Sequence, residues 1–99
     1  MNSKIKDKNA DFLFQAILQL QSVEECYQFF EDICTMAEMH ALSQRLQVAK
    51  MLKDKVTYQE ISRLTGASTA TISRVNRCVA YGSGGYGLVL ERLEAQGEQ

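Results

Sequence analysis

TYQEISRLTGASTATISRVNRCVAY, residues 57–81, is the stretch of the chain that decides the fold. Thr57 is a good N-cap, and Glu60 three residues later completes a capping box, which predicts the start of a helix. Gly66 can adopt the left-handed conformation that ends a helix, and Ser68 can cap the next one. The stretch therefore predicts two short helices joined by a turn of a few residues.

Both predicted helices have an apolar side and a polar side. In the first helix, the residues expected to face inward are Ile61, Leu64 and Thr65. In the second helix, the apolar side is expected to hold Ile72, Val75 and Val79. The opposite side of the second helix is small, polar and cationic, with Ala70, Ser73, Arg74 and Arg77. Such a face on a helix that follows a tight turn is typical of a recognition helix in the DNA major groove.

The same corner also allows a different function. Helix–glycine–helix corners with polar outer faces occur in many small helical proteins, so this one could belong to a helical protein–protein interaction module without DNA binding. The segment 65–81 contains arginines, small hydroxyl side chains and no acid, which favours DNA. An enzyme is not indicated, because no paired carboxylates, metal-ligand cluster or nucleophile–base pair is evident.

Two segments resemble the Trp repressor family: GASTATISR at residues 66–74 and AKMLKDKVTYQE at residues 49–60. CYQFFEDIC at residues 26–34 and LSQRL at residues 42–46 fit its YerC/YecD branch. The resemblance extends from about Phe12 to Leu93. It implies an all-α, six-helix fold with a helix-turn-helix, an intertwined homodimer, and the function of a DNA-binding transcriptional repressor.

The resemblance also implies which residues contact DNA. The candidates for base edges are Thr69, Ala70 and Ser73, with Gln59 and Ser62 nearby. The candidates for phosphates are Tyr58, Ser68, Arg74 and Arg77. Thr71 lies among these positions and belongs to the same candidate interface. A dimer would place two recognition helices about one DNA turn apart, ~34 Å, and would prefer a palindromic operator in double-stranded DNA.

The effector pocket of the family is altered in this chain. In the Trp repressor the indole lies between two arginines, of which one matches Arg74 and the other falls on Gln44. A glycine and a serine of that pocket correspond to Val75 and Cys78. Because Val75 removes room and Gln44 removes a cationic wall, we expect no tryptophan corepressor, which leaves another small effector or none. No other cofactor and no metal is expected.

Length and composition indicate the number of domains, the type of secondary structure and the expected location of the protein. Ninety-nine residues predict one domain, 1–99, and the absence of proline favours helices. No apolar run approaches the ~18 residues of a membrane span, and nothing resembles a signal peptide, so we expect a cytoplasmic protein. The three cysteines are odd in number and form no close-spaced pair, so we expect buried free thiols.

Charge is distributed unevenly along the chain. The net charge of −1 combines +4 in Met36–Ala80, −3 in residues 1–35 and −2 from Tyr81 onward. The region with the predicted helix-turn-helix is therefore locally basic, and for nucleic-acid binding the local sign matters more than the total.

The remaining segments predict four more helices, at residues 9–20, 23–33, 36–53 and 86–93. Residues 1–8 are expected to be a flexible arm, and residues 94–99 are expected to fray. The helix at 9–20 is apolar around most of its circumference, which a chain of this size can hardly cover. This feature favours a partner subunit, and the alternative is a compact monomer with an apolar surface patch.

Overall fold

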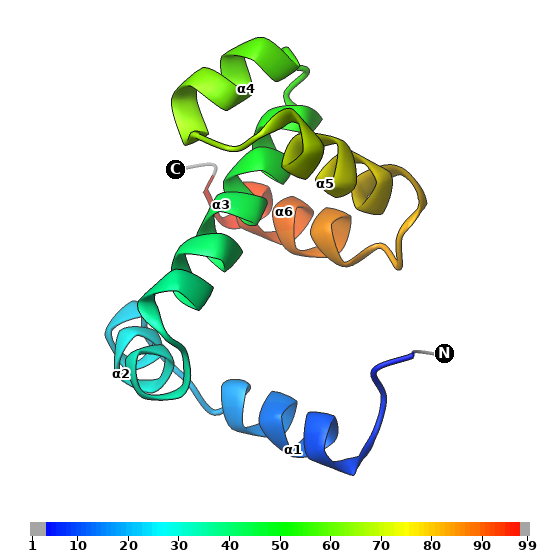
Figure 1. Cartoon of the computed structure of the whole chain (residues 1–99). Coiled ribbons are helices and arrows are strands. Elements are labelled where there is room, and N and C mark those ends of the chain that lie inside the picture. The colour runs from blue at the N-terminus through cyan, green and yellow to red at the C-terminus, as the bar shows by residue number, and fades with distance from the viewer. Residues whose placement is uncertain (1–3, 98–99) are drawn as a thin grey trace. The chain divides into compact units, whose positions relative to one another are not determined.

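The structure, a computed structural model, describes residues 4–97, and the described residues form helices and no strand (Figure 1). The helices are α1 (Lys8–Ile17), α2 (Val23–Ile33), α3 (Met36–Lys53), α4 (Tyr58–Thr65), α5 (Thr69–Tyr81) and α6 (Gly85–Gln96). The predicted all-α, six-helix fold is confirmed. The chain divides into two compact units, Met1–Met36 and Ala37–Gln99, and its organisation as one domain stays a prediction.

The first unit contains α1 and α2. The predicted bounds of α2 are confirmed, since the Ser22 hydroxyl accepts a hydrogen bond from the backbone N–H of Glu25. α1 differs from the prediction because Asp7 caps it, accepting from the N–H of Ala10 at 2.6 Å. The helix therefore begins inside the expected arm and ends at Ile17, before the predicted end. Residues 1–3 of that arm lie outside the described residues.

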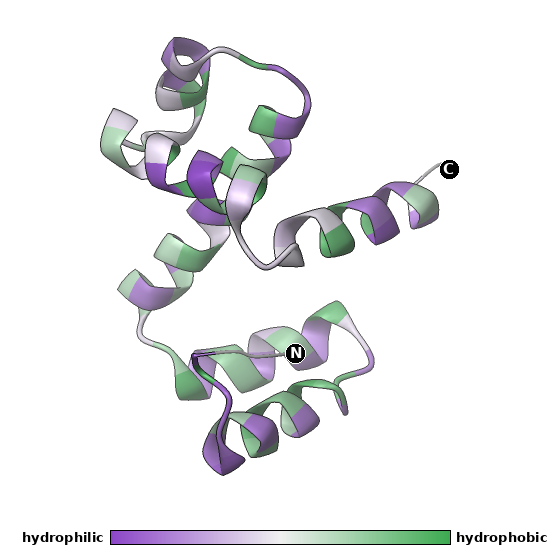
Figure 2. Cartoon of the chain, turned by 90° about the vertical axis from the view of Figure 1, so that its right-hand side faces the viewer, coloured by the Kyte–Doolittle hydropathy of each residue, from purple (hydrophilic) through white to green (hydrophobic). Residues whose placement is uncertain are grey.

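The helices of the first unit bury no residue completely. Phe12 is 75% exposed and Leu18 is 79% exposed. The rings of Phe29 and Phe30 pack edge to face, with their centroids 5.3 Å apart. Figure 2 shows hydrophobic residues along both helices. This unit therefore presents much apolar surface to solvent in the single chain.

The second unit has a core built from four helices and the turn between α4 and α5. Its buried residues are Val48, Ala49, Ile61, Ala67, Ile72, Val75 and Leu90. Burying each of the larger aliphatic side chains contributes about 1.5–3 kcal/mol to stability. The prediction that Leu64 faces inward was wrong, because Leu64 is 53% exposed.

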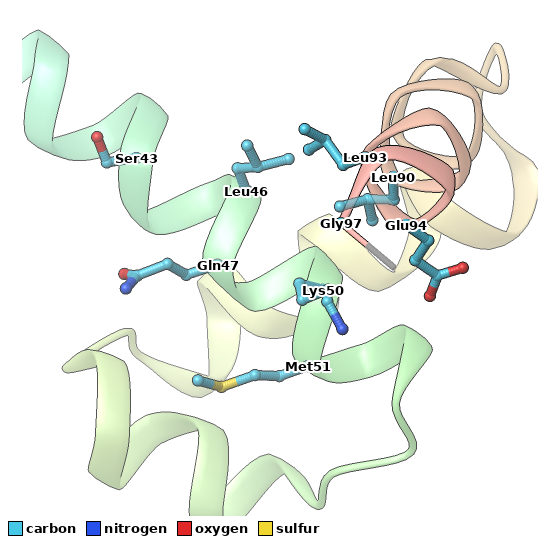
Figure 3. A pocket seen from close by; sticks show the side chains of 9 residues that line it. All are labelled: Ser43, Leu46, Gln47, Lys50, Met51, Leu90, Leu93, Glu94 and Gly97. Atoms are coloured by element: carbon cyan, nitrogen blue, oxygen red, sulfur yellow. The ribbon is translucent and has the colours of Figure 1, made fainter. Parts of the chain in front are cut away.

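α6 is longer than predicted at both ends. The Lys53 Nζ lies 3.1 Å from the Glu94 Oε1, so an ion pair joins the end of α3 to the last turn of α6. Residues 94–96, which are expected to fray, belong to α6 in the structure, and residues 98–99 lie outside the described residues. A groove of about 660 Å³ lies between α3 and α6, and Figure 3 shows Leu46 and Leu93 facing each other across it.

Within residues 4–97, no helix combines the length and the apolar character that crossing a bilayer requires.

Candidate nucleic-acid interface

α4 begins and ends as the sequence predicts. The Thr57 hydroxyl accepts from the N–H of Glu60 at 3.2 Å, which satisfies one of the free donors at the helix start. Gly66 ends the helix in the left-handed conformation, with φ of 76°, and its N–H donates to the carbonyl of Ser62 at 2.9 Å. The direction in which the chain enters the turn is thus fixed by backbone geometry that favours glycine.

Ser68 caps α5, as predicted. Its hydroxyl oxygen accepts from the N–H of Thr71 at 3.1 Å and donates to the Thr71 hydroxyl at 3.2 Å. Both side chains therefore help to start the helix that would enter DNA. Their predicted contacts with DNA stay predictions.

The turn between α4 and α5 is held by hydroxyl groups whose partners the sequence did not reveal. The Thr65 hydroxyl donates to the carbonyl of Ile61 at 2.7 Å and accepts from the N–H of Ala67 at 3.1 Å. The Ser62 hydroxyl donates to the carbonyl of Ala67 at 2.8 Å. Ser62 is a predicted base-edge candidate, but in the structure its hydroxyl proton stabilises the turn. A hydroxyl residue one turn before a helix-ending glycine is the signal for such a role.

The candidate residues lie on α4, on α5 and in the turn, and the two helices pack against each other. The exposed candidates are Tyr58, Gln59, Ser68, Thr69, Ala70, Arg74 and Arg77. The partly buried candidates are Ser62, Thr71 and Ser73. Most of the predicted interface is therefore accessible to a ligand, and its partly buried members border the turn or the core side of α5.

Some cations of the second unit are paired with acids, and others are not. Lys50 pairs with Asp54, Lys53 with Glu94 and Arg63 with Glu60. Within residues 4–97, Arg74 and Arg77 form no ion pair, so their charges are not neutralised locally. A phosphate backbone would therefore meet two available guanidinium groups on α5.

The Glu60–Arg63 pair lies on the surface of α4. The Arg63 Nε donates to the Glu60 Oε1 at 2.9 Å, and the Arg63 Nη2 donates a second hydrogen bond to the Glu60 Oε2. These hydrogen bonds, with the attraction of opposite charges, lower the pKa of Glu60 and raise the pKa of Arg63. In the same way, the hydrogen bond to Asp54 raises the pKa of Lys50.

The candidate effector residues lie in different surroundings. Val75 is 1% exposed and belongs to the core, and the Gln44 Nε2 donates to the carbonyl of Thr65 at 3.1 Å. Arg74 is exposed, and Cys78 lines a separate hollow of about 590 Å³ with Leu46, Tyr86 and Val89 among its neighbours.

The cysteines are free thiols, but the prediction that they are buried was wrong. Cys78 is exposed, and Cys26 and Cys34 are partly exposed. In the part of the chain that the structure describes, no group of three or more His, Cys, Asp or Glu side chains is placed to hold a metal ion.

Comparison with known proteins shows that the chain is similar to Trp repressor proteins and their relatives. The family model of the Trp repressor protein matches residues 8–94. The chain is 52% identical to the uncharacterized protein YerC of Bacillus subtilis (strain 168) over 91 residues, which are 92% of this chain and 88% of that protein.

Two crystal structures share the fold over nearly the whole chain. A TrpR-like protein from Eubacterium eligens ATCC 27750 is 56% identical, with a TM-score of 0.88 and coverage of 93% of this chain and 95% of that one. A candidate Trp repressor from Staphylococcus aureus is 53% identical, with a TM-score of 0.87 and coverage of 91% and 90%.

Proposed function

The chain belongs to the Trp repressor family, and we propose that it is a sequence-specific, DNA-binding transcriptional repressor that acts as a homodimer. The observation that carries this proposal is the outer face of α5. There Arg74 and Arg77 are exposed and make no ion pair within residues 4–97, on a helix that a tight turn and a serine cap hold against α4. This face has the charge and the small side chains that major-groove binding requires.

In the proposed complex, the start of α5 enters the major groove. Ala70 can contact a thymine methyl group, while the hydroxyls of Thr69 and Ser73 can bond to base edges directly or through water. Arg74 and Arg77 bind phosphates, which positions the protein without selecting a sequence. The remaining candidates, which support these contacts from α4 and the turn, are Tyr58, Gln59, Ser62, Ser68 and Thr71.

The exposed apolar surface supports the dimer. α1 and α2 bury no residue in the single chain, and the groove between α3 and α6 is lined by Leu46, Leu90 and Leu93. Large apolar surfaces of this kind usually mark an interface. A homodimer would cover such surface and present two copies of α5 to a palindromic site.

Gln44 and Val75 support a repressor that does not use tryptophan. The amide of Gln44 is hydrogen-bonded to the backbone of Thr65, and Val75 fills the core instead of leaving space for an indole. We propose that this protein has no catalytic activity, because none of its candidate residues combines a nucleophile with a base.

Selection from a pool of random duplexes tests the proposal. We expect the recovered sequences to be palindromic, with half-site centres about 10 base pairs apart. Ser73→Ala should then change the preference at one base pair of each half-site by about 1–3 kcal/mol. Recovery of no common sequence, with duplex affinity independent of salt, would instead favour the protein–protein interaction module.

A further inference from the structure

Gln44 joins α3 to the end of α4. Its Nε2 donates to the backbone carbonyl of Thr65 at 3.1 Å, across 21 residues of sequence. Together with the Lys53–Glu94 pair, it is one of the side-chain hydrogen bonds that connect separate helices of the second unit. Of these two interactions, the Gln44 hydrogen bond is the one that reaches the helix-turn-helix.

The carbonyl that Gln44 binds needs a donor from outside its own helix. Thr65 is the last residue of α4, and the carbonyls of a final helical turn have no partner within the helix. Gly66 then turns the chain away from the helix axis, and the Thr65 hydroxyl is occupied with Ile61 and Ala67. The amide of Gln44 therefore donates a hydrogen bond to a carbonyl that lies at the turn between α4 and α5.

Gln44 lies on the side of α3 that faces the core. It precedes the fully buried Val48 by four residues, so the two side chains share one face of the helix. The apolar contacts of Val48 and Ala49 stabilise the packing but do not depend strongly on direction. A hydrogen bond requires both a short distance and a favourable angle, so the Gln44 amide adds directional control to that packing.

We infer that Gln44 is a positioning residue, which holds the helix-turn-helix in one orientation on α3 and thereby keeps Arg74 and Arg77 directed toward DNA phosphates. The part of this inference that concerns DNA rests on the proposed function. The part that concerns orientation does not depend on DNA, and the two can be measured separately.

Three variants test the inference. Gln44→Met keeps the length of the side chain and removes the donor, whereas Gln44→Lys keeps a donor on a long stem. Gln28→Met makes the same chemical change as the first variant at an exposed position of α2, and it serves as the control. Each variant is examined by NMR, through the carbonyl carbon shift of Thr65 and the residual dipolar couplings of α3, α4 and α5. Affinity is then measured for the best duplex recovered by selection.

We expect Gln44→Met to move the Thr65 carbonyl shift and to change the couplings of α4 and α5 relative to those of α3. Duplex affinity should fall by about two- to tenfold, the range expected for one hydrogen bond, with an unchanged salt dependence because no phosphate contact is lost. Gln44→Lys should restore the couplings, and Gln28→Met should leave the Thr65 carbonyl shift and the couplings of α3, α4 and α5 as in the wild type.

Wild-type couplings and a wild-type Thr65 shift in Gln44→Met would overturn the inference. If Gln44→Met does not fold, Gln44→Lys decides, since wild-type couplings in that variant support positioning by a donor and altered couplings refute it. Altered couplings in Gln44→Met, in a protein whose wild type binds no duplex, would support the positioning role and refute the DNA-binding function.

Discussion

At the scale of single residues, the surroundings of Gln44 and Val75 support the proposal that this protein does not use tryptophan. Val75 carries a branched side chain that is 1% exposed, and a rigid branch of this kind cannot rotate away from an incoming ring. The Gln44 amide is already bound to the Thr65 carbonyl, and it has no full charge to set beside a carboxylate. Of the two cationic groups that the family uses around the indole, Arg74 remains.

We therefore expect L-tryptophan not to bind. Calorimetry at millimolar L-tryptophan should show no heat beyond that of L-leucine, which serves as the control for nonspecific effects. Operator affinity should be the same with and without the amino acid. A dissociation constant of about tens of micromolar, coupled to tighter DNA binding, would contradict this expectation and would show that the core rearranges around Val75.

At the scale of elements, the turn between α4 and α5 depends on the backbone of Gly66. Its φ of 76° is strained for any residue with a Cβ, yet a Cβ added there would meet no atom within 4 Å. Gly66→Ala should therefore lower the free energy of unfolding through backbone strain alone, by about 1–2 kcal/mol. Urea unfolding at fixed protein concentration measures this quantity.

Gly85→Ala is the matched control for that prediction. Its added Cβ also meets no atom within 4 Å, but Gly85 lies at the start of α6 without a positive φ. We expect the free energy of unfolding to stay the same or to rise by about 0.4–1 kcal/mol. A loss of stability no greater in Gly66→Ala than in Gly85→Ala would mean that the left-handed turn is not what ends α4.

The contribution of the Glu60–Arg63 pair to stability depends on pH. Because the pair lowers the folded-state pKa of Glu60, its contribution to stability is complete above the unfolded-state pKa and is lost as pH falls through the folded-state pKa. NMR titration of the Glu60 carboxyl carbon should give a midpoint below the ordinary value for glutamate.

Arg63→Ala should return that midpoint to the ordinary value. Arg77→Ala removes an arginine that is not among the partners of Glu60, and it should leave the midpoint unchanged. If the Glu60 midpoint stayed depressed in Arg63→Ala, the lowering would have to come from the helix start and not from the ion pair.

The helices that were predicted most closely are those whose ends carry local signals. Ser22 and Glu25 set the start of α2, and Thr57, Gly66 and Ser68 set the helix-turn-helix, because each acts on backbone groups within a few residues. The errors arose where the deciding partner is distant or was overlooked. Asp7 caps α1 earlier than expected, and α6 continues beyond residue 93 to the turn in which Glu94 pairs with the distant Lys53.

The candidate site could be predicted only in part for the same reason. The exposed face of α5 follows from helical periodicity, so the exposure of Arg74 and Arg77 could be predicted from the sequence. The partner of Gln44 lies 21 residues away, and no spacing rule predicts it. The hydroxyl of Ser62 could serve DNA or the turn, and the sequence does not distinguish between an outward and an inward hydrogen bond.

At the scale of the whole molecule, we expect a homodimer. Size-exclusion chromatography with light scattering at micromolar concentration should give twice the mass of one chain. Phe12→Asp places a charge on apolar surface that is 75% exposed in the single chain, and it should shift the mass toward that of the monomer.

Gln15→Asp is the control for the dimer prediction, because it adds the same charge on α1 in the polar strip that Asp11, Gln15 and Gln19 form, and it should leave the dimer intact. A wild-type protein with the mass of a single chain would contradict the proposal that the apolar surface of α1 and α2 forms an interface.

The salt dependence of duplex binding tests the central claim most directly. A protein that binds phosphates with α5 should lose affinity linearly in a plot of log affinity against log salt. Arg77→Ala should weaken binding to all duplexes alike and reduce the magnitude of that slope by about one, whereas Arg92→Ala on α6 should leave it unchanged. An Arg77→Ala protein with wild-type affinity and slope would contradict the assignment of this face to DNA.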